Sequence, residues 1–363
     1  MGCDFDLLVK TPLDMENVAA AHIEELEEGV VAIAKPHGFK GIVLVKGSKD
    51  KRVLAEKVKA NVPEAERIIL AEKCVSSKLE DIVQAALEVA KNNLSPGDTF
   101  AVRTVRRGAQ PYTSVDVNVK AGAAIKEALN NPVDLEYPNK VIAIEIVKDI
   151  ALVGVIKEEE LWRKEKPGKY PVLPYLNKIA VVQMPYLGPL DAAKTMGVRI
   201  GREVQTFEVK ELIIAFISKV DAEQLNAFLS GVFEGIRSRY EIQKRSYARK
   251  PQKAEVYVQD LYQLVRERRG EPIIVLEPEG DPITSVSDRI ADIFFSKHER
   301  VNVLIGSREG IPTGVYRFAN LVVDICPGVT ISTDYAAAAA LIAISTVLEE
   351  KLQEKAVKEV VFE

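Results

Sequence analysis

The sequence predicts a multidomain protein in which α+β domains precede a C-terminal α/β domain. Three observations support this fold class. The first segment alternates between short apolar strands and helices, and residues 273–340 contain three strands of buried type that each run into a loop rich in Gly, Pro and small polar residues. A chain of 363 residues also exceeds the size of one ordinary hydrophobic core, so two or three domains are expected.

Composition limits the classes of partner. The net charge of -4 gives no overall attraction to nucleic acid, so any such contact must come from local basic patches. No apolar run approaches the length of a membrane span, and the first residues lack a signal-peptide pattern. Cys3, Cys74 and Cys326 show no C-x-x-C spacing, which suits a reducing cytoplasm and argues against a Cys-based zinc site. We therefore expect a cytoplasmic protein that binds neither membrane nor metal.

Residues 1–77 alternate between strands and helices in the order strand, helix, strand, strand, helix, strand. The strands are FDLLVK, GVVAIAKP, GIVLVKG and AERIILAEKCV, and the helices are NVAAAHIEELE and KRVLAEKVKANV. This βαββαβ order is the ferredoxin-like pattern. His37 beside Gly38 could be functional, but we interpret it as a turn residue.

Residues 78–157 change in character. A helix over LEDIVQAALEVAKNNL ends at Ser95-Pro96-Gly97, and KVIAIEIVKDIALVGVI predicts two strands that meet near Lys148. Residues 97–103, followed by 106–108, 112–114, 122–125 and 133–135, resemble a THUMP domain. The resemblance covers residues 72–157 and implies that this domain binds the acceptor end of tRNA.

Two basic runs are candidates for RNA contact. Arg103, Arg106 and Arg107 lie at a predicted strand end, where guanidinium groups can pair with phosphates. The second run ends a long predicted helix and is interleaved with Tyr240 and Tyr247. An exposed strand end and a solvated helix face are the alternatives. The candidates of the second run are Arg237, Arg239, Lys244, Arg245, Arg249 and Lys250.

Residues 158–174 are polar and contain Pro, so we interpret them as a linker, in which Trp162 could pack between domains or only locally. The last domain, residues 175–363, begins with the strand KIAVVQM, and VQTFEVKELIIAFIS predicts a strand followed by a helix. Three further strands, IIVL, VNVLI and LVVDI, precede the three loops. Because an α/β sheet presents ligands at the carboxyl ends of its strands, these loops predict a ligand crevice. They contain no G-x-G-x-x-G or G-x-x-x-x-G-K-[ST], which disfavours a dinucleotide or P-loop site.

The middle loop reads GSREGIP from Gly306 to Pro312, and ICPGVTISTDY at residues 325–335 precedes an Ala-rich helix. In this order and spacing the two segments resemble the SPOUT class of RNA methyltransferases, of the archaeal type that carries a THUMP domain. In that class they form a trefoil knot that holds S-adenosylmethionine, and the active sites lie across a homodimer interface. The resemblance implies an S-adenosylmethionine-dependent tRNA methyltransferase that works as a homodimer.

The position of the methyl group follows from differences within the class. Ribose-methylating members carry N-x-G-x-x-x-R after the first loop, where this chain has Ser and Val, and Ser332 replaces an Asn of the later segment. A guanine-methylating branch has Asp where this chain has Pro312. Methylation of a base at an unspecified atom is therefore expected.

The resemblance also implies roles for loop residues. Arg308 would hold a phosphate or orient the target, Asp334 is a candidate base, and Ser332 completes the expected catalytic set. Alternatively, Glu309 forms an ion pair and Asp334 caps the Ala-rich helix. The expected cofactor-binding residues, several of them glycines that permit close approach, are Leu276, Pro278, Gly280, Gly306, Glu309, Gly310, Ile311, Ile325, Pro327, Gly328 and Ile331.

Two other functions fit the same residues. One is a non-catalytic tRNA-binding protein or chaperone, whose knotted domain serves dimerisation and RNA binding. The other is an α/β enzyme that uses a different nucleotide. Tight binding of S-adenosylmethionine would discriminate against both.

Overall fold

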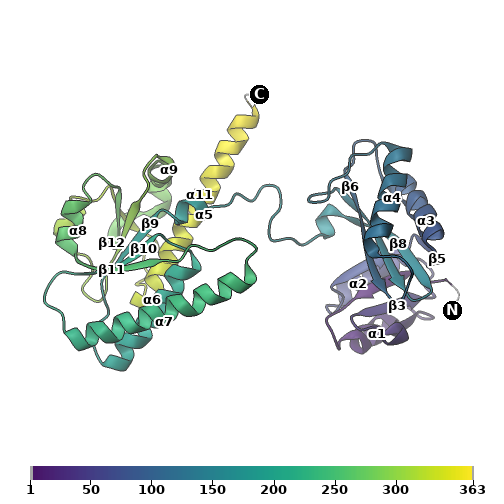
Figure 1. The fold of residues 1–363 in the computed structure, drawn as a ribbon, viewed down its shortest axis with the longest axis horizontal. Helices are drawn as coiled ribbons and strands as arrows, with labels where there is room; N and C mark the ends of the chain where they lie inside the picture. Colours follow the sequence, from purple (N-terminus) through teal and green to yellow (C-terminus); the bar gives the residue numbers. More distant parts are fainter. Residues whose placement is uncertain (1–2, 362–363) are drawn as a thin grey trace. The chain divides into compact units, whose positions relative to one another are not determined.

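The computed structural model describes residues 3–361, and the chain divides into two compact units, residues 1–167 and 168–363 (Figure 1). No helix in the described range is both long enough and apolar enough to cross a membrane.

The first unit begins with a four-stranded antiparallel sheet. Its elements are β1 (Leu7–Lys10), α1 (Glu16–Glu25), β2 (Val31–Ala34), β3 (Ile42–Lys46), α2 (Lys51–Asn61) and β4 (Arg67–Leu70), with a 3-10 turn η1 (Pro36–Gly38). The strand order β2-β3-β1-β4 and the βαββαβ sequence confirm the ferredoxin-like prediction. Side chains alternate across the sheet, so Leu7 and Val9 pack in the core with α1 and α2 while Leu8 faces the opposite side.

The predicted strand AERIILAEKCV is wrong as a single element. It forms two strands, β4 and β5 (Lys73–Ser76), which belong to different sheets. β4 pairs with β1, whereas β5 pairs with β8 (Ile150–Lys157). The apolar pattern continues from β4 into β5 without a break. Only the pairing of the strands shows that the chain passes from one sheet to the other.

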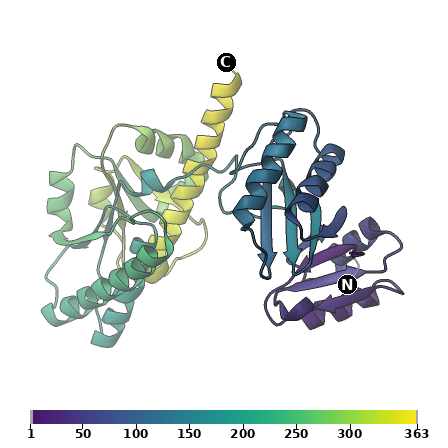
Figure 2. The same ribbon diagram turned by 45° about the vertical axis from the view of Figure 1, so that its right-hand side comes forward.

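The second sheet of this unit has the order β5-β8-β7-β6. Its other elements are α3 (Leu79–Asn93), β6 (Phe100–Arg107), α4 (Ser114–Leu129), β7 (Lys140–Val147) and a 3-10 turn η2 (Glu158–Glu160). α3 and α4 cover one face, and the other face packs against the first sheet in a shared core (Figure 2). The sheets approach closely, because a Cβ at Gly154 would lie 2.2 Å from the carbonyl oxygen of Leu70.

A disulfide joins Cys3 to Cys74 within this unit, with a Cα–Cα distance of 5.4 Å, and leaves Cys326 as the free thiol. The spacing of the cysteines was interpreted as suited to a reducing compartment, and it did not predict this disulfide. Cys3 and Cys74 are 71 residues apart in the chain, and packing of the two sheets brings them together.

The second unit is built on a six-stranded parallel sheet of order β11-β10-β9-β13-β12-β14 (Figure 1). The strands are β9 (Ile179–Gln183), β10 (Glu211–Phe216), β11 (Glu255–Asp260), β12 (Ile273–Pro282), β13 (Val301–Ile305) and β14 (Leu321–Asp324). The helices are α5 (Leu173–Leu176), α6 (Leu190–Thr206), α7 (Ala222–Ser246), α8 (Leu261–Glu267), α9 (Ser287–Phe295), α10 (Thr313–Tyr316) and α11 (Thr333–Val361), with a 3-10 turn η3 (Ile283–Val286).

Helices cover both faces of this sheet, which is why its inner strands are apolar along their whole length. Ile179 and Val181 of β9 face the core formed with α6, α7, α9 and α11, whereas Ala180 and Val182 face the core formed with α8 and α10. All residues of β9 and β13 are buried. The segment VQTFEVKELIIAFIS, predicted as strand then helix, is instead the end of α6 followed by β10.

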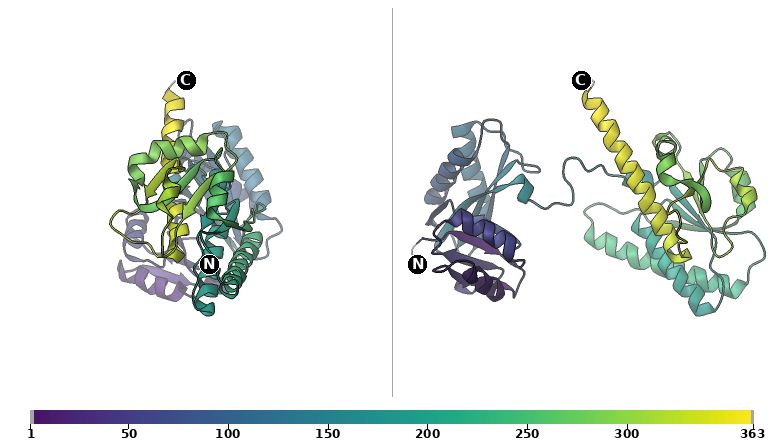
Figure 3. Two further views of the ribbon diagram at one scale, coloured as in Figure 1. Left: turned by 90° about the vertical axis from the view of Figure 1, so that its left-hand side faces the viewer. Right: turned by 180° about the vertical axis from the view of Figure 1, so that it is seen from behind.

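Helices α6 and α7 pack through glycines. A Cβ at Gly197 would lie 2.1 Å from the carbonyl oxygen of Phe228, and one at Gly231 would lie 2.0 Å from that of Lys194. Neither atom could be accommodated, so the two backbones touch. α11 crosses the same side of the sheet and then runs beyond the body of the unit (Figure 3).

Candidate active site

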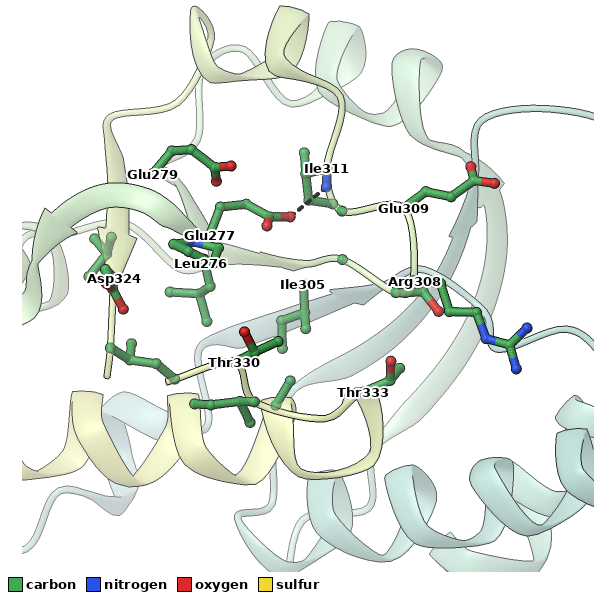
Figure 4. Close-up of a pocket in the computed structure, with 18 of the residues that line it drawn as sticks. Leu276, Glu277, Glu279, Ile305, Arg308, Glu309, Ile311, Asp324, Thr330 and Thr333 are labelled. Atoms are coloured by element: carbon green, nitrogen blue, oxygen red, sulfur yellow. Dashed lines mark hydrogen bonds between the residues drawn. The ribbon is translucent and has the colours of Figure 1, made fainter. Parts of the chain in front are cut away.

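A cavity of about 420 Å³ lies where β12, β13 and β14 end and α11 begins (Figure 4). This is the sheet edge that the three strand-loop units predicted. Its walls come from the second half of β12, the loops after β13 and β14, α10 and the start of α11. The lining residues are Leu276, Glu277, Pro278, Glu279, Ile305, Gly306, Ser307, Arg308, Glu309, Gly310, Ile311, Thr313, Tyr316, Val323, Asp324, Ile325, Val329, Thr330, Ile331, Thr333 and Ala336.

Most of the expected cofactor-binding residues meet in this cavity. Those that line it are Leu276, Pro278, Gly306, Glu309, Gly310, Ile311, Ile325 and Ile331. Gly280, Pro327 and Gly328 do not line it. Gly280 has a packing role instead, because a Cβ there would lie 2.4 Å from the backbone nitrogen of Val323 in the neighbouring strand.

The loop over residues 306–311 is tied at both ends. The fully buried Gln183 donates from Nε2 to the carbonyl oxygen of Gly306 over 3.1 Å, and the Glu277 carboxylate accepts a hydrogen bond from the backbone N–H of Ile311. Gly310 has a φ of 68°, a conformation that favours glycine. These contacts hold the loop along the cavity wall.

Glu277 also explains the glycines of this loop. A Cβ at Gly306 would lie 2.7 Å from Glu277 Oε1, and one at Gly310 would lie 3.2 Å from the same atom. The glycines were expected to let a ligand approach the backbone closely. In this structure the group that approaches them closely is the Glu277 carboxylate. Figure 4 shows Glu277 directed toward Ile311.

The residues expected from the sequence to bind the cofactor include Leu276 and Pro278 but not Glu277 between them. The available signal was a carboxylate directly after the buried run of residues 273–276 in β12. Burial raises the pKa of Glu277, the hydrogen bond from Ile311 opposes that rise, and the neighbouring Glu279 adds to it. Burial and the two carboxylates likewise raise the pKa of Tyr316 to about 12.

Further polar groups in the cavity were also missed. Four further side chains with oxygen atoms line the cavity, as Figure 4 shows: Glu279, Asp324, Thr330 and Thr333. Asp324 Oδ1 accepts from the backbone N–H of Cys326 over 2.9 Å, which orders the turn after β14. Together with Glu277 these groups make the cavity rich in hydrogen-bond acceptors.

Arg308, one of the expected catalytic residues, lies at the edge of this cavity. Its guanidinium carbon is 4.4 Å from the ring centre of Tyr186, and Nη2 donates to the Tyr186 hydroxyl. Tyr186 follows β9, so the pair joins two loops at the same sheet edge. Arg308 is exposed, and its stacked guanidinium offers donors to a group that approaches the cavity from solvent.

A family model of AF2226-like SPOUT RNA methylases fused to THUMP matches residues 173–361, and a THUMP model matches residues 76–156. The chain belongs to this family. The predicted resemblance to THUMP-containing SPOUT methyltransferases is thereby confirmed, and the second unit is its SPOUT RNA methylase domain.

Several proteins are similar to all or part of this chain. An uncharacterized protein of Methanocaldococcus jannaschii is 39% identical over 93% of this chain and 92% of its own length. A probable tRNA sulfurtransferase of the same organism is 42% identical over 22% of this chain and 23% of its own length. Among solved structures, PH1313 from Pyrococcus horikoshii is 20% identical over 82% of this chain and 93% of its own, with a TM-score of 0.35. A putative methyltransferase from Legionella pneumophila, solved with bound SAM, is 16% identical over 68% and 97%, also at 0.35.

Two expected catalytic residues of the SPOUT domain lie outside the cavity lining. Asp334 is 6% exposed, and its Oδ2 lies 2.5 Å from Nη1 of Arg199 on α6. Ser332 Oγ donates to Asp334 Oδ1 over 2.8 Å. Burial alone would raise the pKa of Asp334, but the hydrogen bonds from Ser332 and Arg199 outweigh it and hold that pKa below its usual value. This geometry ties the start of α11 to α6.

The THUMP arginines differ in their freedom to contact RNA. Arg107 Nη1 is 2.7 Å from the buried Glu145, and Arg106 Nη1 donates to the carbonyl oxygen of Gln110 over 2.9 Å. Arg103, which is exposed, donates to the carbonyl oxygen of Leu135 over 3.3 Å. Arg107 is thus engaged inside the unit, whereas Arg103 keeps much of its surface open.

The second basic run occupies the C-terminal part of α7 and the residues just after it, and is partly neutralised. Arg249 forms a two-pronged pair with Glu208 at 2.6 and 2.8 Å, Lys244 pairs with Glu241, and Arg239 contacts the Tyr247 hydroxyl. Arg237, Arg245 and Lys250 are exposed, with no ion pair to another described residue. The free positive charge of this surface therefore rests on fewer residues than the sequence indicates.

Proposed function

We propose that this RNA methylase transfers a methyl group from S-adenosylmethionine to a base of tRNA, with the cofactor held in the cavity at the ends of β12, β13 and β14. The observation that carries the proposal is the meeting, in one cavity of about 420 Å³, of three loops with apolar walls and several carboxylates. That volume lies within the range of about 300–1,000 Å³ usual for small-molecule sites.

The chemistry of the walls suits this cofactor. Leu276, Ile305 and Ile325 offer apolar surface for a purine ring, and the carboxylates of Glu279 and Asp324 can accept hydrogen bonds from ribose hydroxyls. S-adenosylmethionine supplies an electrophilic methyl group on a positively charged sulfur. The excess of carboxylates over Arg308 in the lining complements that positive charge.

Arg308 and Tyr186 are placed to orient the acceptor base. Their stacked pair lies at the cavity edge and combines a flat aromatic face with free guanidinium donors. Positioning of this kind contributes much of the rate in transfer reactions. The ion-paired Asp334 would serve as a base only after separation from Arg199, so we assign it a positioning role at the start of α11.

The identity of the RNA rests on the first unit. Its THUMP domain resembles the matching part of probable tRNA sulfurtransferases, which supports tRNA as the substrate. The SPOUT domain would act as a homodimer and form the trefoil knot of its class. Tyr335 and Ile342, exposed seven residues apart on α11, supply an apolar stripe that suits contact with a second copy.

Calorimetric titration with S-adenosylmethionine tests the cofactor. Thr330→Arg places a long cationic side chain in the cavity, and we expect it to weaken binding at least about 10-fold through steric overlap and charge repulsion. Gly310→Arg should act in the same direction, with added backbone strain at φ 68°. Gly270→Arg, where a side chain meets open space, is the matched control and should bind like the wild type.

Absence of binding to well-folded wild-type protein would overturn the methyltransferase proposal and favour the non-catalytic RNA-binding alternative. If binding is found, transfer of a labelled methyl group to tRNA and mass mapping of the product would identify the base.

A further inference from the structure

The first unit gathers positive side chains at the seam between its two sheets. Lys10 on β1 is the register partner of Arg67 on β4, and Lys10 Nζ reaches across the seam to Glu145 Oε1 at 2.5 Å. Arg107 binds the other oxygen of Glu145. Glu145 is 2% exposed, so this one buried carboxylate is already shared by two cations.

Arg103 lies on the same face of β6 as Arg107, because residues four apart in a strand share a face. It therefore projects toward the seam, where Arg163 reaches the same place from the segment after η2. Arg103 donates to the carbonyl oxygen of Leu135, and Arg163 Nη1 donates to that of the next residue, Glu136. Two guanidinium groups are thus held on consecutive carbonyls of one turn.

This cluster lacks a counter-charge. Burial, together with the positive charges of Arg163 and Arg67, lowers the pKa of Arg103, as expected when like charges are held close together. No carboxylate of the described residues lies within ion-pair distance of Arg67, Arg103 or Arg163. Nη2 of Arg163 also lies out of solvent contact without a hydrogen-bond partner. Three guanidinium groups from three chain segments are therefore arranged to receive an anion.

An exposed indole stands beside this cluster. Leu161 packs into the core between the two sheets, and Arg163 lies 5.6 Å from the ring centre of Tyr137, so the backbone is held on both sides of Trp162. The Trp162 side chain between them is 93% exposed. A large aromatic surface in water next to arginines is the combination that stacks on unpaired bases.

We propose that this seam is a binding site for single-stranded RNA, in which Arg67, Arg103 and Arg163 hold a backbone phosphate and Trp162 stacks on an adjacent unpaired base. The site rests on the RNA substrate of the proposed function and adds to it residues of the ferredoxin-like sheet and of the segment after η2. It lies in the first unit, outside the cofactor cavity and outside the basic run at the C-terminal end of α7.

The chain contains a single Trp, so its emission reports on this site alone. Free protein should show emission of a water-exposed indole that is readily quenched by acrylamide. Titration of the full chain with a single-stranded oligoribonucleotide should quench the emission and saturate, while the same sequence as a duplex should leave it nearly unchanged. An indole shielded in the free protein would contradict the proposal and indicate packing against protein.

Variants test the phosphate contacts, with affinity measured by anisotropy of labelled RNA. Arg67→Gln with Arg103→Gln should weaken single-strand binding about 10-fold or more and lower the salt slope by about 1–2. Lys49→Gln with Arg52→Gln removes the same charge from exposed positions of the same unit and should change affinity less than about 2-fold. Trp162→Ala should weaken binding about 5- to 100-fold through lost stacking.

Failures of the site and of the proposed function can be told apart. RNA binding that leaves Trp162 emission unchanged and is equal in the double variant would overturn this site while leaving an RNA substrate in place. Failure of the wild type to bind any RNA by anisotropy would overturn both.

Discussion

Two neighbouring carboxyl groups in the SPOUT domain ionise in opposite ways. Asp334 keeps its charge because Ser332 and Arg199 donate to it. Glu203, one turn along α6 from Arg199, is half-buried, and burial raises its pKa to about 7, with the backbone N–H of Ala338 opposing and the charge of Asp334 adding to the rise. Its Oε2 has no hydrogen-bond partner. Glu203 is therefore the group near the start of α11 whose charge changes close to neutral pH.

Replacement of Glu203 by Gln should alter the pH dependence of stability. A carboxyl pKa of about 7 in the folded state, above 4.5 when unfolded, means that the folded state holds the proton more tightly, so stability falls as pH rises from about 4.5 to 7. With allowance for its partial exposure, we expect the wild type to lose about 1–2 kcal/mol relative to Glu203→Gln between pH 5 and pH 8. The depressed pKa of Asp334 acts only at lower pH.

Thermal unfolding of wild type and variant at pH 5 and pH 8 measures this difference. A stability difference that is the same at both values would show that Glu203 is charged throughout and contradict the expected titration.

At the scale of elements, α6 and α7 are positioned by their glycines. Gly197 and Gly201 on α6 face carbonyl oxygens of α7, and Gly231 and Gly235 on α7 face carbonyl oxygens of α6. Each helix contributes glycines that lie against the backbone of the other, so a shift of either helix would break the close contact at both sets of glycines. Because Arg199 lies between the two α6 glycines, this contact also sets where Arg199 meets Asp334.

Gly197→Ala should separate the helices and destabilise the SPOUT domain by about 1–3 kcal/mol or more, the usual range for overpacking. Gly270→Ala adds the same methyl group in open space and should stay within about 0.5 kcal/mol of the wild type. Urea unfolding followed by circular dichroism provides the measurement. Equal midpoints for the two variants would mean that the helices yield freely at this contact.

At the scale of the whole molecule, the chain consists of two units that each have their own cores. The ferredoxin-like and THUMP sheets share one of these cores, with Leu8 and Leu44 on one side and Val141 and Leu152 on the other. The cavity proposed to bind the cofactor lies entirely within residues 276–336 of the second unit.

Residues 1–167 and 168–363 made as separate chains should therefore each fold cooperatively, and the second should bind S-adenosylmethionine within about 3-fold of the full chain. A cut between residues 77 and 78 is the control, since it divides the core shared by the two sheets and should give unstable fragments. Calorimetry and thermal unfolding compare the four fragments. An unfolded 168–363 fragment would show that the units depend on each other.

Local pattern in the sequence was enough to predict much of this protein. Period-two and period-3.6 apolar repeats located most of the strands and several of the helices, because burial of one face is a local property of an element, but helix α6 was not predicted. Gly- and Pro-rich loops after three apolar strands predicted the cavity, since parallel strands end at one edge of a sheet. The loop motifs themselves carried the resemblance to the SPOUT family that the family model confirms.

Only the tertiary structure decided which neighbour each side chain meets. The pairing of β12 with β14 shifts register between Leu276 and Asp281, which interrupts the alternation of side chains. The sequence therefore could not show that Glu277 turns into the cavity while Gly280 packs against β14. Arg107 with Glu145 and Asp334 with Arg199 are joined across 38 and 135 residues. Such pairs depend on how sheets and helices stack, which no local pattern of residues records.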